Sequence, residues 1–492
     1  MKRGSVLFVG AGPGDPKLLT IRGKEALEQA DVVIYDRLAN PLLLTHVKKE
    51  AKLIYCGKEA DRHTLPQDEI NLLLIEEAQK GQTVVRLKGG DPSMFGRVGE
   101  EAQICVAHAI PFEIVPGVTS GMAAPLYAGI PLTHRDYNSS VAFVTGHLCD
   151  KNAGKEPDWA ALASVETLVI YMGVKNLSRI KERLLKHGKA KETPVALVRW
   201  GTLGEQQTLV GKLERIDQEV AIAGFKAPAI IVVGEVVRLR ESLNWFESRP
   251  LFGKRIAVAS KPVESNAENL ACRLAQLGAE VISIPLVESS GAFPSDEGMP
   301  ADFFSYQWLV FDDAQQVAFF LQELRRRKFD LRQIKGKLAA RGPDAAEALE
   351  QNGLYPDEVV DEGLDPAHLH HYLALRKGER LLYLKHGDSM VVLHALGTVT
   401  HTVQAGTLEW NRTHPAAKWL LEQPIDWFAT EDSYHLSALQ SFAGAEWQKK
   451  PLICVGKETE REARQMGWHV FSIEQFEQLV QTSLEPEKTV SC

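Results

Sequence analysis

A glycine-rich turn is the first feature of the chain whose residues could do chemistry. Residues 10–16 read GAGPGDP and follow the apolar run SVLFV. A Walker phosphate loop needs a lysine and a hydroxyl after its last glycine, but Asp15 and Pro16 stand there. A dinucleotide fingerprint needs a glycine at position 15, and Pro13 removes a backbone N–H donor. The turn therefore does not suit a phosphate, and a strand-to-helix turn without a ligand is the plain alternative.

Four similar motifs follow, each at the end of an apolar run. They are KGGDP (88–92), PGVTS (116–120), YMG (171–173) and RWGT (199–202). In open α/β sheets, ligands usually bind at the carboxyl ends of the strands. The ordered series therefore predicts one ligand site built from strand-end loops.

Alternating strands and helices must position these loops. Short β-branched runs such as SVLFVG and DVVIYD alternate with amphipathic segments such as LLTIRGKEALEQA. This pattern is typical of α/β units with a largely parallel sheet, and VAFVTGH, TLVIYMG, PVALVRWG and PAIIVVGEVV continue it. The rhythm stops in RESLNWFESRPLFG (240–253) and restarts with KRIAVASKP, which indicates a domain boundary.

The second half contains a weak internal repeat. Glycines stand eleven residues apart twice, as Gly342 with Gly353 and as Gly456 with Gly467. The segments WLVFDDAQQVAFF and WFATEDSYHLSALQSF follow one residue pattern, and GKRIAVAS resembles GERLLYLK. The repeat predicts two similar α/β lobes, which usually enclose a cleft.

Composition narrows the class of protein. The 56 Lys and Arg against 64 Asp and Glu give a net charge of -8, which argues against general binding to nucleic acid or an anionic membrane. The six cysteines form no CxxC pair and no long apolar run occurs, so we expect a cytoplasmic protein in a reducing compartment. A histidine cluster, His368, His370 and His371, lacks a supporting motif and predicts an exposed helix or turn, with no metal.

Residues 5 to about 246 resemble the tetrapyrrole methylase superfamily, and in particular the uroporphyrinogen-III C-methyltransferases. The motifs that carry the resemblance are GAGPGDP, YDRL, GKEADRHTLPQDEIN, VVRLKGGDP, FGR, EE, PGVTS, AGIPLTHR, TGH, YMGV and PAIIVVGEVV. The resemblance implies a two-domain methylase fold, a homodimer, and S-adenosylmethionine bound between the two domains. The cationic sulfonium and neutral adenine of this donor suit carbonyl acceptors and small-residue loops rather than a phosphate cradle.

The resemblance also implies a reaction, the methylation of uroporphyrinogen III at two ring carbons. Its product would be precorrin-2, which leads to sirohaem or cobalamin. The resemblance assigns single residues to roles in this reaction. Asp36 would be the base and Lys58 the acid. The donor would contact Pro13, Gly89, Gly90, Asp91, Met94, Thr119, Ser120, Met172 and Gly201. The carboxylate-rich acceptor would contact Asp15, Arg37, Arg62, Arg97 and Arg135. Ser93 and Val98 depart from the aromatic residue and the glycine usual in the family. The alternatives are a methylase of a later corrin precursor and an oxidoreductase or nucleotide-binding regulator.

Residues 252 to about 480 resemble uroporphyrinogen-III synthase, a two-lobed enzyme that closes hydroxymethylbilane with inversion of one ring. Thr459 keeps a motif threonine that would bind substrate. Other motif segments carry residues that differ from those usual in the family. They are Ser260-Lys261-Pro262, Phe311-Asp312-Asp313, Gln315, Ala345, Trp410 and Thr430-Glu431-Asp432-Ser433. Several changes add carboxylates where a polycarboxylate should bind, which is unfavourable. Two hypotheses remain, a working cyclase and a non-catalytic module that stabilises the chain or binds a partner, and the changes favour weak or lost activity.

The expected organisation has four parts. A methyltransferase occupies residues 1–246, with subdomains of about 1–135 and 136–246, and a linker follows at 247–253. The two-lobed synthase-like part occupies 254–482, and 483–492 form a tail.

Overall fold

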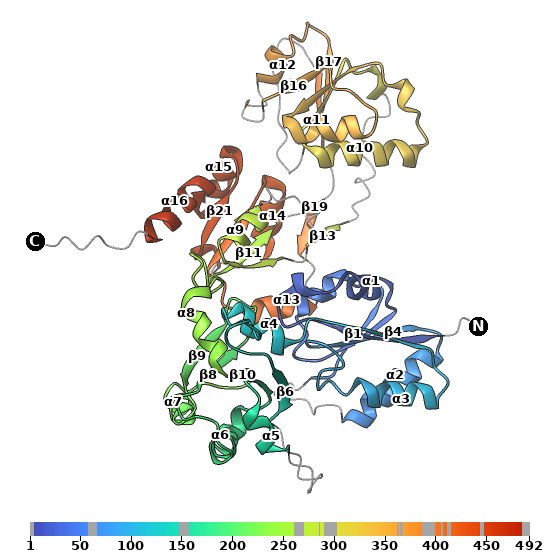
Figure 1. Cartoon of the computed structure of the whole chain (residues 1–492). Coiled ribbons are helices and arrows are strands. Elements are labelled where there is room, and N and C mark those ends of the chain that lie inside the picture. Colours follow the sequence, from blue (N-terminus) through green and yellow to red (C-terminus); the bar gives the residue numbers. More distant parts are fainter. Residues whose placement is uncertain are drawn as a thin grey trace, which may run out of the picture.

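A computed structural model describes residues 4–57, 66–146, 157–259, 270–284, 286–289, 303–361, 364, 368–385, 399–404, 407–410, 415–442 and 447–484. Within them, the chain forms four five-stranded sheets and one two-stranded ladder. The first two sheets belong to the N-terminal half and the other three to the C-terminal half, as the colours of Figure 1 show.

The first sheet is parallel, as predicted, and has the strand order β3-β2-β4-β1-β5. Its strands are β1 (Ser5–Gly10), β2 (Val32–Tyr35), β3 (Lys52–Tyr55), β4 (Thr83–Lys88) and β5 (Phe112–Val115), with α1 (Ile21–Gln29), α2 (Gln67–Gln79) and α3 (Val98–Ala107) between them. Val6 and Phe8 of β1 lie in one apolar cluster and Leu7 and Val9 in another. Both faces of the sheet are therefore buried, as the β-branched runs require.

The second sheet differs from the prediction of a largely parallel sheet. It has the order β6-β7-β10-β8-β9, and only β6 and β7 pair in parallel. The strands are β6 (Val141–Thr145), β7 (Thr167–Tyr171), β8 (Pro194–Arg199), β9 (Gln207–Lys212) and β10 (Ala229–Val233), with α5 (Trp159–Ser164), α6 (Leu177–Lys186) and α7 (Ile216–Ile222) between them. The prediction was wrong because the connection from β8 to β9 is too short for a crossover, so these strands must be antiparallel.

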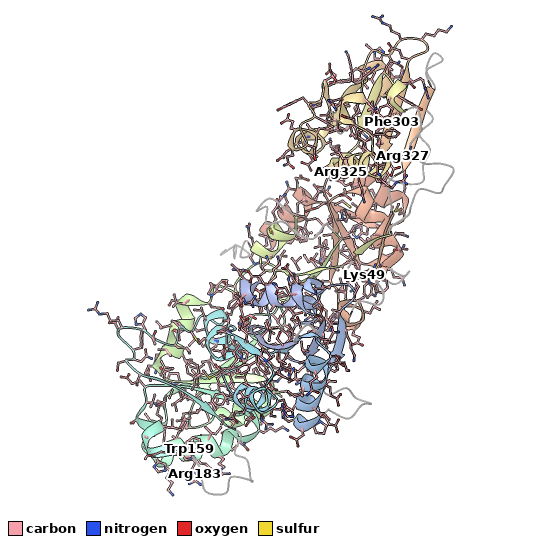
Figure 2. The ribbon with its side chains drawn as sticks, turned by 90° about the vertical axis from the view of Figure 1, so that its right-hand side faces the viewer. Lys49, Trp159, Arg183, Phe303, Arg325 and Arg327 are labelled. Carbon is pink, nitrogen blue, oxygen red and sulfur yellow. The ribbon has the colours of Figure 1, made fainter. Side chains whose placement is uncertain are left out.

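The C-terminal half consists of two lobes, as the repeat predicted. Lobe 1 has the parallel order β12-β11-β20-β21-β22, and lobe 2 has the parallel order β16-β15-β14-β17-β18. The antiparallel ladder of β13 (Leu286–Ser289) and β19 (Thr407–Trp410) lies between them (Figure 1). The side view places Phe303 of lobe 2 and Trp159 of the second sheet's layer far apart (Figure 2).

Lobe 1 is built from two separate stretches of chain. It contains β11 (Arg255–Ala259), α9 (Leu270–Gln276), β12 (Glu280–Ser283), α13 (Pro415–Glu422), β20 (Trp427–Thr430), α14 (Ser433–Phe442), β21 (Pro451–Cys454), α15 (Lys457–Gln465), β22 (His469–Ser472) and α16 (Ile473–Leu484). Lobe 2 is inserted after β12 and β13. It contains β14 (Trp308–Phe311), α10 (Ala314–Arg327), β15 (Lys337–Arg341), α11 (Gly342–Gln351), β16 (Glu358–Val360), α12 (Leu369–Tyr372), β17 (Arg380–Lys385) and β18 (Val399–Gln404).

The repeated glycines explain why the two lobes share a pattern. Gly342 starts α11 with φ 80° and Gly456 precedes α15 with φ 83°. Gly353 and Gly467, with φ 75° and 89°, follow the ends of the same helices. All four positions lie in the left-handed region that favours glycine.

The structure also bears on two features outside the sheets. Within the described part of the chain, no helix combines the length and apolar character that crossing a membrane needs. His368, His370 and His371 lie at and within the short helix α12, and two of them are exposed.

Candidate active site

Two glycine-rich loops pack directly against each other at the carboxyl ends of β1 and β4. Gly12 N–H donates to Gly90 O at 3.2 Å, and Gly90 N–H donates to Gly12 O at 2.7 Å. A Cβ atom added to Gly10 would lie only 2.6 Å from the Cα of Gly117, in the PGVTS loop. A side chain at Gly10 would therefore separate the GAGPGDP and PGVTS loops, whereas Gly12 and Gly90, with φ of 75° and 70°, adopt the left-handed conformation that favours glycine.

Asp91 ties the KGGDP loop to the PGVTS loop. Its carboxylate accepts the backbone N–H groups of Gly117 at 3.0 Å and of Ser93 at 2.8 Å, and also the Ser93 hydroxyl. Burial opposes ionisation of Asp91, but these hydrogen bonds outweigh it and lower the pKa. Ser93, which departs from the family pattern, thus helps to fix Asp91 as a carboxylate.

Loops of the second sheet reach the same place. A hydrogen bond of 2.7 Å joins the hydroxyl of Tyr171, at the end of β7, to the Thr119 hydroxyl. The Tyr171 hydroxyl also accepts Gly121 N–H at 2.9 Å. The Thr202 hydroxyl, after β8, accepts the backbone N–H of Asp15 at 3.0 Å. The prediction that the strand-end loops gather in one place is therefore confirmed for GAGPGDP, KGGDP, PGVTS, YMG and RWGT.

Strained backbone marks this junction. Met172, Trp200 and Thr202 have φ of 55°, 48° and 75°, although none is glycine. Such residues cost about 1–3 kcal/mol each and gather at functional sites. Met172 is also 54% exposed, so its side chain does not simply fill the core.

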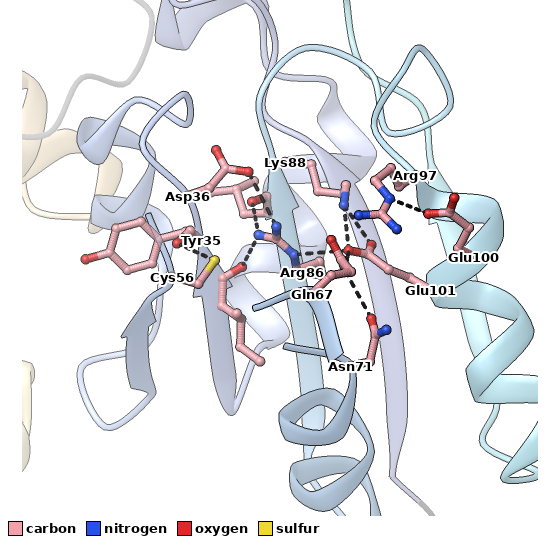
Figure 3. Close-up of polar contacts among 12 residues, drawn as sticks. Tyr35, Asp36, Cys56, Gln67, Asn71, Arg86, Lys88, Arg97, Glu100 and Glu101 are labelled. Carbon is pink, nitrogen blue, oxygen red and sulfur yellow. Dashed lines mark hydrogen bonds and ion pairs between the residues drawn. The ribbon is translucent and has the colours of Figure 1, made fainter. Parts of the chain in front are cut away.

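A buried group of charges lies beneath the carboxyl ends of β2 and β4 (Figure 3). Lys88 Nζ lies 2.8 and 2.7 Å from the two carboxylate oxygens of Glu101, whose side chain is 0% exposed. Arg86 lies 3.7 Å from Glu101 and 3.5 Å from Asp36. Burial and the neighbouring Arg86 lower the pKa of Lys88, against the opposing effect of Glu101. Two cations are thus held between two carboxylates.

Asp36 is the member of this group that reaches solvent. Its side chain is 28% exposed, and one carboxylate oxygen accepts Leu38 N–H at 3.0 Å while the other faces Arg86. The carboxylate is therefore held in one orientation and stays accessible, which suits a proton acceptor.

Comparison with known proteins identifies the family. Residues 5–217 match the Tetrapyrrole (Corrin/Porphyrin) Methylases, and residues 268–481 match uroporphyrinogen-III synthase HemD. A uroporphyrinogen-III C-methyltransferase of Bacillus subtilis (strain 168) is 48% identical over 356 residues, which cover 72% of each chain. The chain belongs to the tetrapyrrole methylases.

Other similar proteins match the N-terminal half. A uroporphyrinogen-III C-methyltransferase of Priestia megaterium is 53% identical over 235 residues, which cover 48% of this chain and 98% of the relative. A uroporphyrin-III C-methyltransferase structure from Thermus thermophilus, in complex with S-adenyl homocysteine, is 39% identical with a TM-score of 0.41 and covers 48% of this chain and 100% of that one. The predictions of a methyltransferase that uses S-adenosylmethionine and of a C-terminal synthase-like half are confirmed at the level of the families.

All nine predicted donor residues of this tetrapyrrole methylase lie in or next to the loops of the junction. Met94, from the first subdomain, packs against the apolar cluster of the second that includes Tyr171. Gly201 is buried, and a Cβ atom there would lie 2.3 Å from that of Ala124. The rest lie in the loops already described: Pro13, Gly89, Gly90, Asp91, Thr119, Ser120 and Met172.

The predicted acceptor residues are less concentrated. Arg37 and Arg135 are exposed, and the Arg97 guanidinium pairs with Glu100 at 2.5 Å. Asp15 caps the turn that follows it by accepting Lys17 N–H at 2.9 Å, and burial raises its pKa. Thr459 is buried in α15 of lobe 1 and does not belong to the loop junction. Lys58 and Arg62 lie outside the described residues.

Sequence reasoning missed three polar side chains at this site, Lys88, Glu101 and the Tyr171 hydroxyl. Each lay inside a quoted motif, as the lysine of KGGDP, the second residue of EE and the tyrosine of YMG. The missing signal was burial, because a glutamate on an amphipathic helix is usually solvated. Glu101 is buried because α3 places it against Arg86 and Lys88 of β4 and Gln67 of α2.

Proposed function

We propose that this methylase transfers methyl groups from S-adenosylmethionine to two ring carbons of uroporphyrinogen III, giving precorrin-2. The observation that carries the proposal is the junction of five strand-end loops from two subdomains. The accessible Asp36 lies near it, because a Cβ atom on Gly89 would lie 2.6 Å from the Cβ of Leu38, two residues after Asp36. Backbone groups and small residues dominate the junction, which suits a sulfonium donor. The relatives named for this reaction support the choice of acceptor.

Asp36 is the proposed base. When the electron-rich ring carbon takes the methyl group from sulfur, S-adenosylhomocysteine leaves and the methylated ring is cationic. The ring then loses a proton from another position as its double bonds rearrange, and the Asp36 carboxylate accepts this proton. Arg86 keeps this carboxylate oriented. Lys58 remains the proposed acid on the family resemblance.

Two assays test the methylation. Labelled S-adenosylmethionine is supplied first with uroporphyrinogen III and then with hydroxymethylbilane. Label in a tetrapyrrole in the first reaction supports the proposal, and its absence there rejects it. In single-turnover experiments Asp36→Asn should slow methyl transfer by about 10²- to 10⁴-fold, the range of general base catalysis. Asp344→Asn, at an exposed aspartate of α11 in lobe 2, is the matched control.

For the C-terminal half we infer weak or no synthase activity. Asp312, where the synthase family has a hydroxyl residue, accepts hydrogen bonds from Arg341 at 2.5 Å and from the Tyr383 hydroxyl at 2.6 Å. Glu431 accepts Leu270 N–H at 2.9 Å, and Asp432 accepts His435 N–H at 2.8 Å. The new carboxylates thus serve internal contacts instead of presenting hydroxyl donors to a substrate.

The product isomer decides between a cyclase and a non-catalytic module. Purified protein is given hydroxymethylbilane, and the uroporphyrinogen isomers are separated. Isomer I alone, as in the spontaneous reaction, supports the non-catalytic module, and isomer III formed at a rate proportional to protein concentration rejects it.

The same resemblance leads us to propose a cytoplasmic homodimer formed through the methylase half. Sedimentation equilibrium of the full chain tests the assembly, and a monomer at micromolar concentration would reject it.

A further inference from the structure

We propose that lobe 1 of the synthase-like half holds the two donor loops of the methylase half, GAGPGDP and RWGT, in their binding geometry. The inference rests on the proposed donor site and goes beyond it, because it gives the second half a role in methylation. Two separate sets of contacts lead from lobe 1 to the two loops.

The first set of contacts runs through the short helix η2 (Pro41–His46), which packs on α13 of lobe 1. Leu42 of η2 packs against the apolar cluster of lobe 1 that contains Leu420 and Phe428. Asn40 caps η2 by accepting Leu42 N–H at 3.0 Å, and its amide donates to Gly14 O at 2.9 Å. The position of α13 therefore affects the position of the GAGPGDP loop, through the packing of Leu42 and the hydrogen bonds of Asn40.

The second set of contacts reaches the RWGT loop. Glu280, the first residue of β12, packs so closely that a Cβ atom on Gly204 would lie 2.7 Å from the Glu280 Cβ. Arg255 of β11 holds Glu280 at 2.7 Å and lies 3.5 Å from Glu205. Residues 204 and 205 directly follow the Thr202 and Leu203 turn, so lobe 1 supports the segment that carries Gly201.

The two donor loops and lobe 1 also share one electrostatic environment. Burial raises the pKa of Glu280 against the effect of Arg255, and the charges of Glu205 and Asp15 raise it further. Asp15 belongs to GAGPGDP, and its backbone N–H bonds Thr202. The charge of Glu280 in lobe 1 therefore interacts with the charge of Asp15, which belongs to the loop that carries Pro13.

These contacts make Leu42, Gly204 and Glu280 positioning residues rather than catalytic ones. Leu42 packs on the apolar cluster of lobe 1, and Gly204 and Glu280 pack on each other next to the RWGT loop. Their removal should weaken donor binding and leave the chemical step intact, so KM for S-adenosylmethionine should rise while kcat stays within about twofold.

The experiment titrates the full chain with S-adenosylhomocysteine by calorimetry and measures kcat and KM for methyl transfer. Gly204→Ala places its methyl group against Glu280 and should raise the Kd about tenfold. Leu42→Ala, which removes a contact without a clash, should act in the same direction. Arg273→Met is the control, because it breaks an ion pair of 2.6 Å between two helices of lobe 1, α9 and α16.

A double variant separates support by lobe 1 from local damage to the loop. Glu280→Gly removes the atoms that Gly204→Ala would meet, so the double variant should bind no worse than Glu280→Gly alone. Additive losses overturn the inference, as does wild-type affinity in all three single variants. If the wild-type chain binds no S-adenosylhomocysteine, both the proposed donor site and the inference are wrong. If the wild type binds it and the variants bind it with the same affinity, only the inference is wrong.

Discussion

Glu101 is the residue whose replacement tests the buried charge group most directly. Its carboxylate lies 2.7 Å from Lys88 Nζ, 3.7 Å from Arg86 and 2.9 Å from the Gln67 amide. Glu101→Gln keeps the shape and the hydrogen-bonding oxygen but removes the charge. Lys88 and Arg86 then remain buried, and among the described residues the partly exposed Asp36 is the carboxylate that still faces Arg86.

The expected loss follows from these distances. At an effective dielectric of about 20, opposite charges 2.7 Å apart attract each other by about 6 kcal/mol. Part of this attraction is retained, because the glutamine oxygen still accepts a hydrogen bond from Lys88. Removal of one partner from a buried ion pair typically costs about 3–5 kcal/mol of stability. We therefore expect Glu101→Gln to lower the opening free energy of the first sheet by about 3–5 kcal/mol.

Hydrogen exchange read by mass spectrometry measures this loss, because a multidomain chain does not unfold in one step. Peptides from β1 and β4 should exchange at least about 100-fold faster in the variant. Glu100→Gln is the matched control, since Glu100 carries the same side chain one position earlier but is 57% exposed. Surface pairs contribute about 0–1 kcal/mol, so that variant should exchange nearly as the wild type does. Equal exchange in the two variants would refute the reasoning.

The pH dependence gives a second check of the same substitution. Loss of the Glu101 charge should lower the folded-state pKa of Lys88 further below its unfolded value. A lysine with a depressed folded pKa destabilises the fold at pH values below that pKa, and the penalty disappears as the pH rises towards about 10.4. The loss of opening free energy in the variant, measured by hydrogen exchange with correction for the intrinsic rate at each pH, should therefore become smaller from pH 7 to pH 9.5. A constant loss would exclude Lys88 as its source.

Three further predictions concern other parts of the chain. Tyr171→Phe removes the hydroxyl that bonds Thr119 and Gly121, and should weaken S-adenosylhomocysteine binding about tenfold in calorimetry, whereas unchanged affinity would show that this hydroxyl does not hold the loop. Arg341→Met leaves Asp312 and Tyr383 without their cation, and should lower the opening free energy of lobe 2 by about 3 kcal/mol in hydrogen exchange of β14 and β15, while β11 stays unchanged as the internal control. Burial raises the pKa of Cys105 to about 11 and of Cys454 to about 12, so both thiols should resist maleimide at pH 8 in the native chain, and labelling at the rate of the unfolded protein would contradict this.

Local patterns in the sequence were enough to predict much of this architecture. The alternation of β-branched and amphipathic runs predicted α/β layers, because side-chain periodicity is fixed by the neighbouring residues themselves. Gly342 and Gly456 predicted two similar lobes, because a left-handed turn at a helix start favours glycine in either lobe. The strand-end motifs predicted a shared site, since parallel strands end at one edge of their sheet.

Other features depended on pairings between distant segments. The antiparallel pairing of β8 with β9 and β10 follows from how the chain returns to the sheet, which no single run of residues records. Likewise, lobe 1 combines residues from before and after lobe 2, so its extent is decided by the pairing of β11 with β20.

By itself, then, the sequence determined the succession of strands and helices along the chain, the glycine turns and the residues that stand at strand ends. Only the tertiary structure decided which polar groups lose contact with water, as Glu101 and Lys88 do, and which side chains join the two halves of the chain, as Glu280 and Leu42 do. The physical reason is that burial and long-range contact depend on the packing of elements far apart in the chain, whereas turn and strand preferences depend on neighbouring residues.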